Sequence, residues 1–180
     1  MKATGIVRRI DDLGRVVIPK EIRRTMRIRE GDPLEIYTDA EGEVIFKKYS
    51  PMGDLAEFTA QYAEVLHKAL GVPVFITDRD RVVAYSGAGK REYMDKRVSP
   101  ALEKLMENRA GFLAAAGNTA AVQPLEGRDE AASMAFPIVG NGDVTGCVGS
   151  LFGKENAYPT AAEGKLLQVA AQFLARQTGE

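Results

Sequence analysis

Asp11-Asp12-Leu13-Gly14-Arg15-Val16-Val17-Ile18-Pro19-Lys20-Glu21-Ile22-Arg23-Arg24 is the stretch that decides how the first part of this 180-residue chain folds. Its start is typical of a tight turn, because Asp bonds to nearby backbone and Gly adopts a positive φ. The β-branched run that follows favours a strand, and Pro19 suits the first position of a short helix. Ile22 and Met26 share one face of that helix, which leaves the arginines on its other sides.

Further strands are expected around this stretch. Residues 3–9 and 16–18 are predicted as one pair of strands, and residues 34–38 and 43–49 as a second pair joined by a polar turn. Four short strands and one helical turn bury too little apolar surface for a segment of about fifty residues to be stable alone. We therefore expect two chains to share this fold.

Positive charge is concentrated at the beginning of the chain. Residues 1–29 hold nine basic and three acidic side chains, a net charge of +6, whereas the whole chain has a net charge of −1. A basic block in a nearly neutral protein is typical of a surface that binds a polyanion. Seven of the nine cations are arginine, whose fork matches phosphate or guanine. Charge alone also leaves open an ordinary solvated surface.

Ordered motifs in residues 1–49 resemble the AbrB family of bacterial transition-state regulators. The motifs are Thr4-Gly5-Ile6-Val7-Arg8, residues 12–19, residues 21–24 and Leu34-Glu35-Ile36-Tyr37. The resemblance implies a swapped-hairpin β-barrel that is formed by two chains and binds double-stranded DNA through arginines. By motif position the implied DNA contacts are Arg8, Arg15, Arg23 and Arg24, and charge alone adds Arg9 and Lys20.

The rest of the chain has the periodicity of a packed domain. Helices are predicted at 54–70, from Ser99-Pro100 onward and at 160–177, where Thr160 and Glu163 have the spacing of a capping box. Strands are predicted at 72–77, 81–85, 119–124, 132–139 and 144–152. This order indicates an α+β domain with an antiparallel sheet and flanking helices.

The same element order, with the patterns at 136–140 and 146–149, is similar to GAF-type sensor domains. Two domains are therefore expected, an AbrB-like DNA-binding domain at 1–53 and a GAF-like sensor or oligomerisation domain at 54–180, with 50–53 as a short boundary. The signature of cyclic-nucleotide-binding members is missing. An unidentified small-molecule ligand of the C-terminal domain therefore stays open, and its binding residues are unknown.

The chain offers little for catalysis. It has one cysteine, Cys147, and one histidine, His67, without a nucleophile–base pair or a set of metal ligands in the sequence. Cys147 among small apolar neighbours is typical of a buried side chain. We expect no enzyme activity, no metal and no cofactor.

Location and assembly also follow from the sequence. No apolar leader and no apolar run of the ~20 residues that a membrane span needs is found. We expect a cytoplasmic, nucleoid-associated protein without a membrane partner. The apolar stripes at 54–70 and 160–177 suit packing between chains. This predicts a homotetramer, built from the barrel dimer by pairing of the C-terminal helices.

Together these patterns predict a DNA-binding transcriptional regulator whose C-terminal domain assembles or modulates it, and the resemblance implies that it acts as both activator and repressor. A role in sporulation-stage genes is implied by resemblance alone, because the whole chain is similar to sporulation regulators that join such a domain to a sensor-like domain. The alternative is an antitoxin-like interaction protein whose C-terminal part binds a protein partner. Such tails are generally extended, whereas residues 54–180 have the periodicity of a packed domain.

Overall fold

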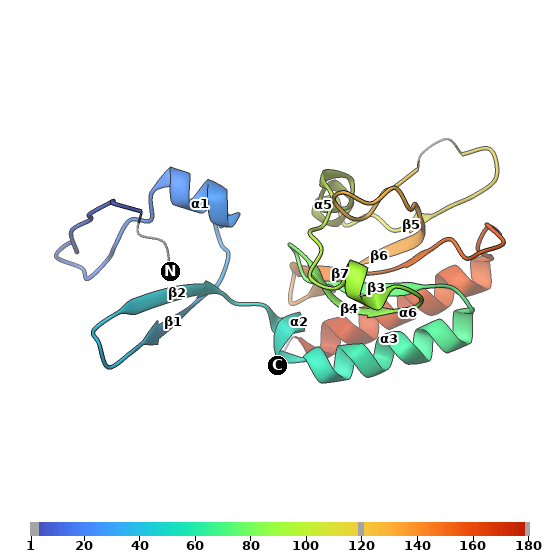
Figure 1. The fold of residues 1–180 in the computed structure, drawn as a ribbon, viewed down its shortest axis with the longest axis horizontal. Helices are drawn as coiled ribbons and strands as arrows, with labels where there is room; N and C mark the ends of the chain where they lie inside the picture. Colours follow the sequence, from blue (N-terminus) through green and yellow to red (C-terminus); the bar gives the residue numbers. More distant parts are fainter. Residues whose placement is uncertain (1–3, 119–120, 179–180) are drawn as a thin grey trace. The chain divides into compact units, whose positions relative to one another are not determined.

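The computed structural model describes residues 4–118 and 121–178. The chain divides into two compact units, Met1–Tyr49 and Ser50–Glu180, called here the first unit and the second unit (Figure 1). The predicted domain boundary lies four residues later, after residue 53. Residues 50–53, predicted as a short boundary, belong mostly to helix α2 (Pro51–Asp54). Met52 of this helix is fully buried in the core of the second unit.

The first unit contains one short helix and one hairpin. Helix α1 spans Lys20–Met26, so Pro19 lies just before its first residue rather than in it. Strands β1 (Leu34–Thr38) and β2 (Val44–Lys48) pair antiparallel. The side chain of Asp39 shapes the hairpin turn, because it accepts the backbone N–H groups of Glu41 at 3.0 Å and Glu43 at 2.9 Å.

Of the strands predicted at 3–9 and 16–18, residue 3 lies outside the described part of the chain, and residues 4–9 and 16–18 form no strand in the single chain. Apart from the turn at 12–14, residues 4–19 have no regular secondary structure. Val7, Ile10 and Val17 are 89%, 69% and 70% exposed. A strand exists only where a neighbouring strand satisfies its backbone N–H and C=O groups, and one chain supplies no such neighbour here. The apolar pattern of a strand is present, but the ladder that it needs is missing.

The second unit is built on a five-stranded antiparallel sheet. Its strands are β3 (Val74–Thr77), β4 (Val82–Ser86), β5 (Phe112–Leu113), β6 (Ala132–Gly140) and β7 (Asp143–Leu151), in the order β4-β3-β7-β6-β5. Every neighbouring pair is antiparallel, as predicted.

The edge of this sheet differs from the prediction. Of the strand predicted at 119–124, residues 119–120 lie outside the described part of the chain and residues 121–124 form no strand. Pro124 has no N–H to give to a ladder. The two-residue strand β5 lies beside β6 instead, opposite Met134 and Ala135. The pairing of β6 with β5 ends at Ala135, and Pro137 follows two residues later in β6.

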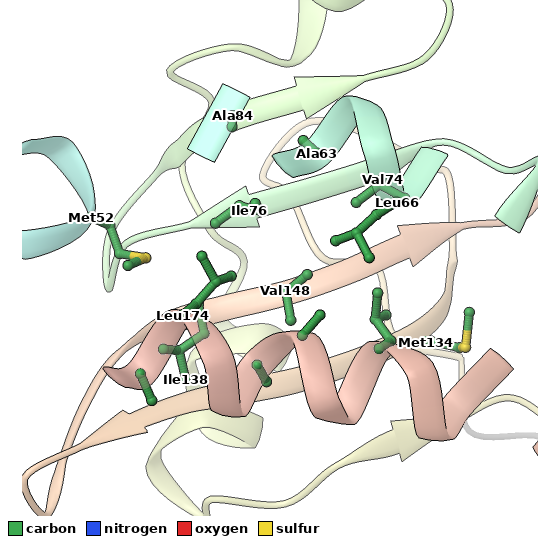
Figure 2. Close-up of a cluster of buried hydrophobic side chains, with 14 of the residues drawn as sticks. Met52, Ala63, Leu66, Val74, Ile76, Ala84, Met134, Ile138, Val148 and Leu174 are labelled. Atoms are coloured by element: carbon green, nitrogen blue, oxygen red, sulfur yellow. The ribbon is translucent and has the colours of Figure 1, made fainter. Parts of the chain in front are cut away.

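Helices cover both faces of the sheet. Helices α3 (Ala56–Leu70) and α6 (Ala161–Gln177) lie together on one face (Figure 1). Leu66 of α3 and Leu174 of α6 are buried in one cluster with Ile76, Val148 and Met134 of the sheet (Figure 2). Close packing of such side chains is the main source of stability in a domain of this size.

The other face of the sheet is covered by α5 (Pro100–Glu107) and the short helix α4 (Lys90–Tyr93), which was not predicted. Phe75, Tyr85, Leu102 and Cys147 are buried in a second cluster there. Complete burial raises the pKa of the Cys147 thiol, because the thiolate loses its hydration. The prediction that Cys147 is a small buried side chain is confirmed.

The predicted capping box at the start of α6 is present. Thr160 Oγ1 accepts the backbone N–H of Glu163 at 3.2 Å, and Glu163 Oε2 accepts the backbone N–H of Thr160 at 2.6 Å. These bonds hold the pKa of Glu163 below its usual value, first through the backbone N–H of Thr160 and then through its hydroxyl. The box satisfies N–H groups that the helix itself leaves without a partner.

We expect Thr160→Ala to lower the free energy of unfolding at neutral pH by about 1 kcal/mol, because the N–H of Glu163 loses its acceptor. Thr160→Ser keeps the hydroxyl and should keep most of the stability. Because the pKa of Glu163 is lowered on folding, its contribution is complete above its ordinary pKa and is lost as the pH falls through the lowered one. Urea unfolding measured across that range checks both statements, and equal losses for the two variants would contradict the cap.

Candidate nucleic-acid interface

Arg15 closes a tight turn that begins at Asp11. The backbone N–H of Asp11 donates to the carbonyl of Arg15 at 3.1 Å, and the N–H of Gly14 donates to the carbonyl of Asp11 at 3.0 Å. Gly14 has a φ of +76°, a conformation that glycine adopts without strain. The turn therefore presents Arg15 from a defined backbone position.

The side chain of Asp11 completes this turn. The sequence predicted that Asp bonds to nearby backbone here, but not that Asp11 also bonds to the side chain of Arg15. Its Oδ1 accepts the backbone N–H groups of Leu13 at 3.0 Å and Arg15 at 2.8 Å, and its Oδ2 accepts Nε of Arg15 at 2.8 Å. These bonds keep the pKa of Asp11 below its usual value, with the backbone N–H of Arg15 the largest cause and its side chain the second. The available signal was an Asp four residues before an Arg, with Gly14 in the turn between them.

Helix α1 carries three more of the predicted contacts. Lys20, Arg23 and Arg24 lie along it, and none of its residues is buried. Arg23 and Arg24 are in its last turn, where the partial negative charge of the helix end favours cations. The chain then leaves the helix at Arg27 in a left-handed conformation, with a φ of 52°.

The structure thus places the predicted contacts in three places. Arg8 and Arg9 lie in the irregular segment before the turn, Arg15 lies in the turn, and the remaining three lie on α1. All six are exposed, as a DNA contact requires. Exposed guanidinium groups can donate paired hydrogen bonds to phosphate oxygens or to the N7 and O6 atoms of guanine.

Apolar side chains are also exposed over much of the first unit. Among its described residues only Pro19 is buried. In the hairpin Ile36 lies opposite Phe46, and their exposed fractions are 61% and 41%. The exposed large apolar residues of the first unit are Ile6, Val7, Ile10, Leu13, Val16, Val17, Met26, Ile36, Tyr37, Val44, Phe46 and Tyr49. An exposed apolar surface of this extent is typical of an interaction surface.

Metal and membrane features are missing from the described part of the chain. Among residues 4–118 and 121–178, no group of three His, Cys, Asp or Glu side chains is arranged to hold a metal ion. His67 Nδ1 lies 2.7 Å from the carbonyl of Val72 within its own unit. No described helix combines the length and apolar character needed to cross a bilayer.

The fold of the second unit, a helix-covered antiparallel sheet, is that of GAF domains. The solved GAF domain/HD domain protein from Geobacter sulfurreducens is similar to it, with a TM-score of 0.55 and 15% sequence identity over 73% of this chain and 96% of that chain. With the basic first unit, the fold and site define a class of protein that joins an arginine-rich basic domain to a GAF-like domain. The prediction of a GAF-like fold for the C-terminal domain is confirmed.

Sequence comparisons then identify the family. A family model described as "Stage V sporulation protein T C-terminal, transcription factor" matches residues 54–179, and one described as "Antidote-toxin recognition MazE, bacterial antitoxin" matches residues 7–54. Stage V sporulation protein T of Bacillus subtilis (strain 168) is 52% identical over 98% of each chain. The transition state regulatory protein AbrB of the same organism is 65% identical over 51 residues, which are 28% of this chain and 52% of that protein. The chain therefore belongs to the stage V sporulation protein T family of transcription factors.

Proposed function

We propose that the chain regulates transcription of sporulation-stage genes, as activator and repressor, by binding double-stranded DNA through Arg8, Arg15, Arg23 and Arg24, with Arg9 and Lys20 as neighbouring contacts. The observation that carries the proposal is that all six side chains are exposed in a segment whose excess charge is positive. The family description names a transcription factor, which agrees with this use of the surface.

The proposed contacts serve two purposes, which are affinity for DNA and recognition of its sequence. Arginines on phosphates supply affinity and set the position of the protein, but they carry no sequence information. Reading of bases in the major groove falls to those arginines that reach guanine edges. An arginine surface without Asn or Gln beside it discriminates bases modestly and also responds to DNA shape. Such a protein tolerates varied sites, which suits a regulator of many genes.

A second copy of the chain is the proposed partner of the first unit. The segments 3–9 and 16–18 gain strand neighbours when two chains interleave, and the exposed apolar side chains of the first unit become buried between them. Burial of apolar surface contributes roughly 25 cal/mol per Å². Formation of the dimer also doubles the number of arginines that one molecule brings to DNA.

The outer faces of α3 and α6 are proposed to join two dimers into a homotetramer. Val65 on α3 and Val169 on α6 are 59% and 52% exposed. Phe58 and Tyr62 of α3 stack with a ring-centroid distance of 5.8 Å, and Phe173 of α6 packs against both. A shallow groove of about 760 Å³ beside α6 is lined by Val139, Gly140, Asn141, Val169, Gln172, Phe173, Ala175 and Arg176. These features are typical of a helix face that packs against another helix.

We infer that the protein is not an enzyme and that it works in the cytoplasm in association with the nucleoid, because a transcription factor acts where the chromosome lies. A small-molecule ligand of the second unit stays a prediction without assigned residues. The single cysteine supports the absence of thiol chemistry, since Cys147 is fully buried and its thiolate is disfavoured.

The antitoxin-like alternative draws support from the model that matches residues 7–54. The second unit argues against it, because a sheet with a buried cluster on each face is a packed domain and not an extended clamp. The regulator is therefore the function that the structure supports best.

DNA binding should depend on salt and on the proposed arginines. We expect log affinity for labelled duplex DNA to fall linearly with log salt. Arg15→Ala and the double variant Arg23→Ala/Arg24→Ala should weaken binding and reduce the slope by about one for each lost phosphate contact. Arg91→Ala removes an exposed arginine of the second unit and is the matched control. If all variants bind as well as the unchanged protein, the arginines are only surface charge.

Assembly should depend on the outer helix face. We expect a sedimentation mass of four chains for the full-length protein and of two chains for Val169→Glu, because a buried carboxylate loses its hydration. Gln168→Glu places the same charge at an exposed polar position and should leave the tetramer intact. A two-chain mass for the unchanged protein would remove the tetramer and keep the barrel.

Limited proteolysis should separate the regulator from the antitoxin-like alternative. A packed second unit is expected to persist as a resistant fragment that begins near Ser50, because its backbone is hydrogen-bonded and buried. Mass spectrometry of the fragments checks this. Rapid digestion of the whole C-terminal part would instead agree with a flexible clamp.

A further inference from the structure

We propose that Asp11 is a positioning residue of the DNA interface, which holds the guanidinium of Arg15 at Nε so that its Nη1 and Nη2 groups face the DNA. The inference rests on the proposed function, since it concerns how one of the proposed contacts is prepared. It assigns a role to an acidic side chain in a surface whose other functional groups are basic.

The two carboxylate oxygens of Asp11 have separate roles. Oδ1 accepts two backbone N–H groups of the turn, those of Leu13 and Arg15. Oδ2 accepts the side chain of Arg15 at 2.8 Å. The same residue therefore fixes the backbone from which Arg15 projects and the plane of its guanidinium. The lowered pKa of Asp11 means that the carboxylate is charged at neutral pH.

The bond to Nε determines which part of Arg15 is left for DNA. A guanidinium presents N–H donors on Nε and on both Nη atoms, and all of them lie in one plane. With Nε engaged, the pair of Nη groups at the far end remains available. That end matches two oxygens of a phosphate or the N7 and O6 atoms of guanine. The Arg15 side chain is 69% exposed, which leaves this end open to a ligand.

Holding an arginine in advance also lowers the entropic cost of binding. A free arginine on the surface samples many rotamers and loses them when it binds. The contact to Asp11 removes part of that freedom before DNA arrives. As an exposed ion pair it contributes little to the stability of the fold. Its effect is therefore expected in DNA binding rather than in folding.

Electrostatic repulsion alone predicts the opposite effect on DNA binding when Asp11 is removed. A carboxylate near DNA repels phosphates, so its removal should strengthen binding if it does nothing else. The chain contains its own comparison, because the neighbouring Asp12 is exposed, carries the same charge and takes no part in the bonds that Asp11 makes. A positioning role predicts different outcomes for these two carboxylates.

The test is a double-mutant cycle on the full-length protein. Dissociation constants for fluorescein-labelled duplexes of random sequence are measured for the unchanged protein, Asp11→Asn, Arg15→Ala and Asp11→Asn/Arg15→Ala, with Asp12→Asn as control. Asp11→Asn keeps an oxygen for the backbone N–H groups and loses the ion pair. We expect it to weaken binding about fivefold although it removes a negative charge. Asp12→Asn should leave the affinity unchanged or raise it by at most about twofold.

The Arg15→Ala variant distinguishes a positioning role of Asp11 from a role in supporting the turn. In that variant, Asp11→Asn should not weaken binding, because the group that it positions is gone. A similar loss on both backgrounds would overturn the inference in favour of a structural role, as would stronger or unchanged binding of Asp11→Asn alone. If Arg15→Ala itself binds normally, the proposed DNA contact of Arg15 fails, and that result differs from a failure of the positioning alone.

The dependence on salt and sequence then shows what Arg15 contacts. A phosphate contact gives a loss that is uniform over sequences and a smaller salt slope for Asp11→Asn, as for Arg15→Ala. A guanine contact gives a loss concentrated on the duplexes that the unchanged protein selects from the random pool. In either case the inference requires that Asp11→Asn and Arg15→Ala change binding in the same way.

Discussion

Within one chain, the first unit neither buries its apolar side chains nor gives residues 4–19 a strand neighbour for their backbone groups. The organisation of the molecule follows from this constraint. Val7 and Val17 are exposed to solvent, and the segment that contains them has no strand neighbour. In the proposed dimer the same sequence therefore has to encode a surface for the second chain and a surface for DNA. Separation of β-branched residues from arginines along the chain meets both needs, because one set is available for burial and the other stays exposed.

The second unit has the opposite character. Its sheet is covered on both faces, and its buried residues form one cluster under α3 and α6 and another under α4 and α5. The apolar core of this domain is buried within one chain, so its exposed helix faces are available for the proposed assembly. In the proposed arrangement the first unit holds DNA, and the second unit determines how many DNA-binding barrels one molecule carries.

Local patterns were enough to predict much of this structure. The turn before Arg15, the β1–β2 hairpin, the long helices and the Thr160 capping box depend on residues close in sequence, and the structure contains all of them. The segments 4–9 and 16–18 have no strand neighbour within the described chain, so their apolar pattern alone does not make them strands, and the proposed second chain would supply that neighbour. Strand β5 is too short to have a pattern, and α2 forms because Met52 packs against distant residues. The predicted arginines are exposed, but the geometry of Asp11 required the structure, since an acidic residue carries no signal for DNA binding.

Pro137 bears on how this protein avoids aggregation through the edge of its sheet. Strand β5 pairs with only part of β6, and no described strand pairs with residues 136–140 on that side, where Pro137 is half-buried. Pro137 pairs in register with Cys147 of β7, and as a proline it has no N–H to offer to an incoming strand. Exposed sheet edges promote amyloid-like aggregation, and proline is a common safeguard against it. At high protein concentration, this edge is expected to resist the strand addition that would turn an ordered assembly into a precipitate.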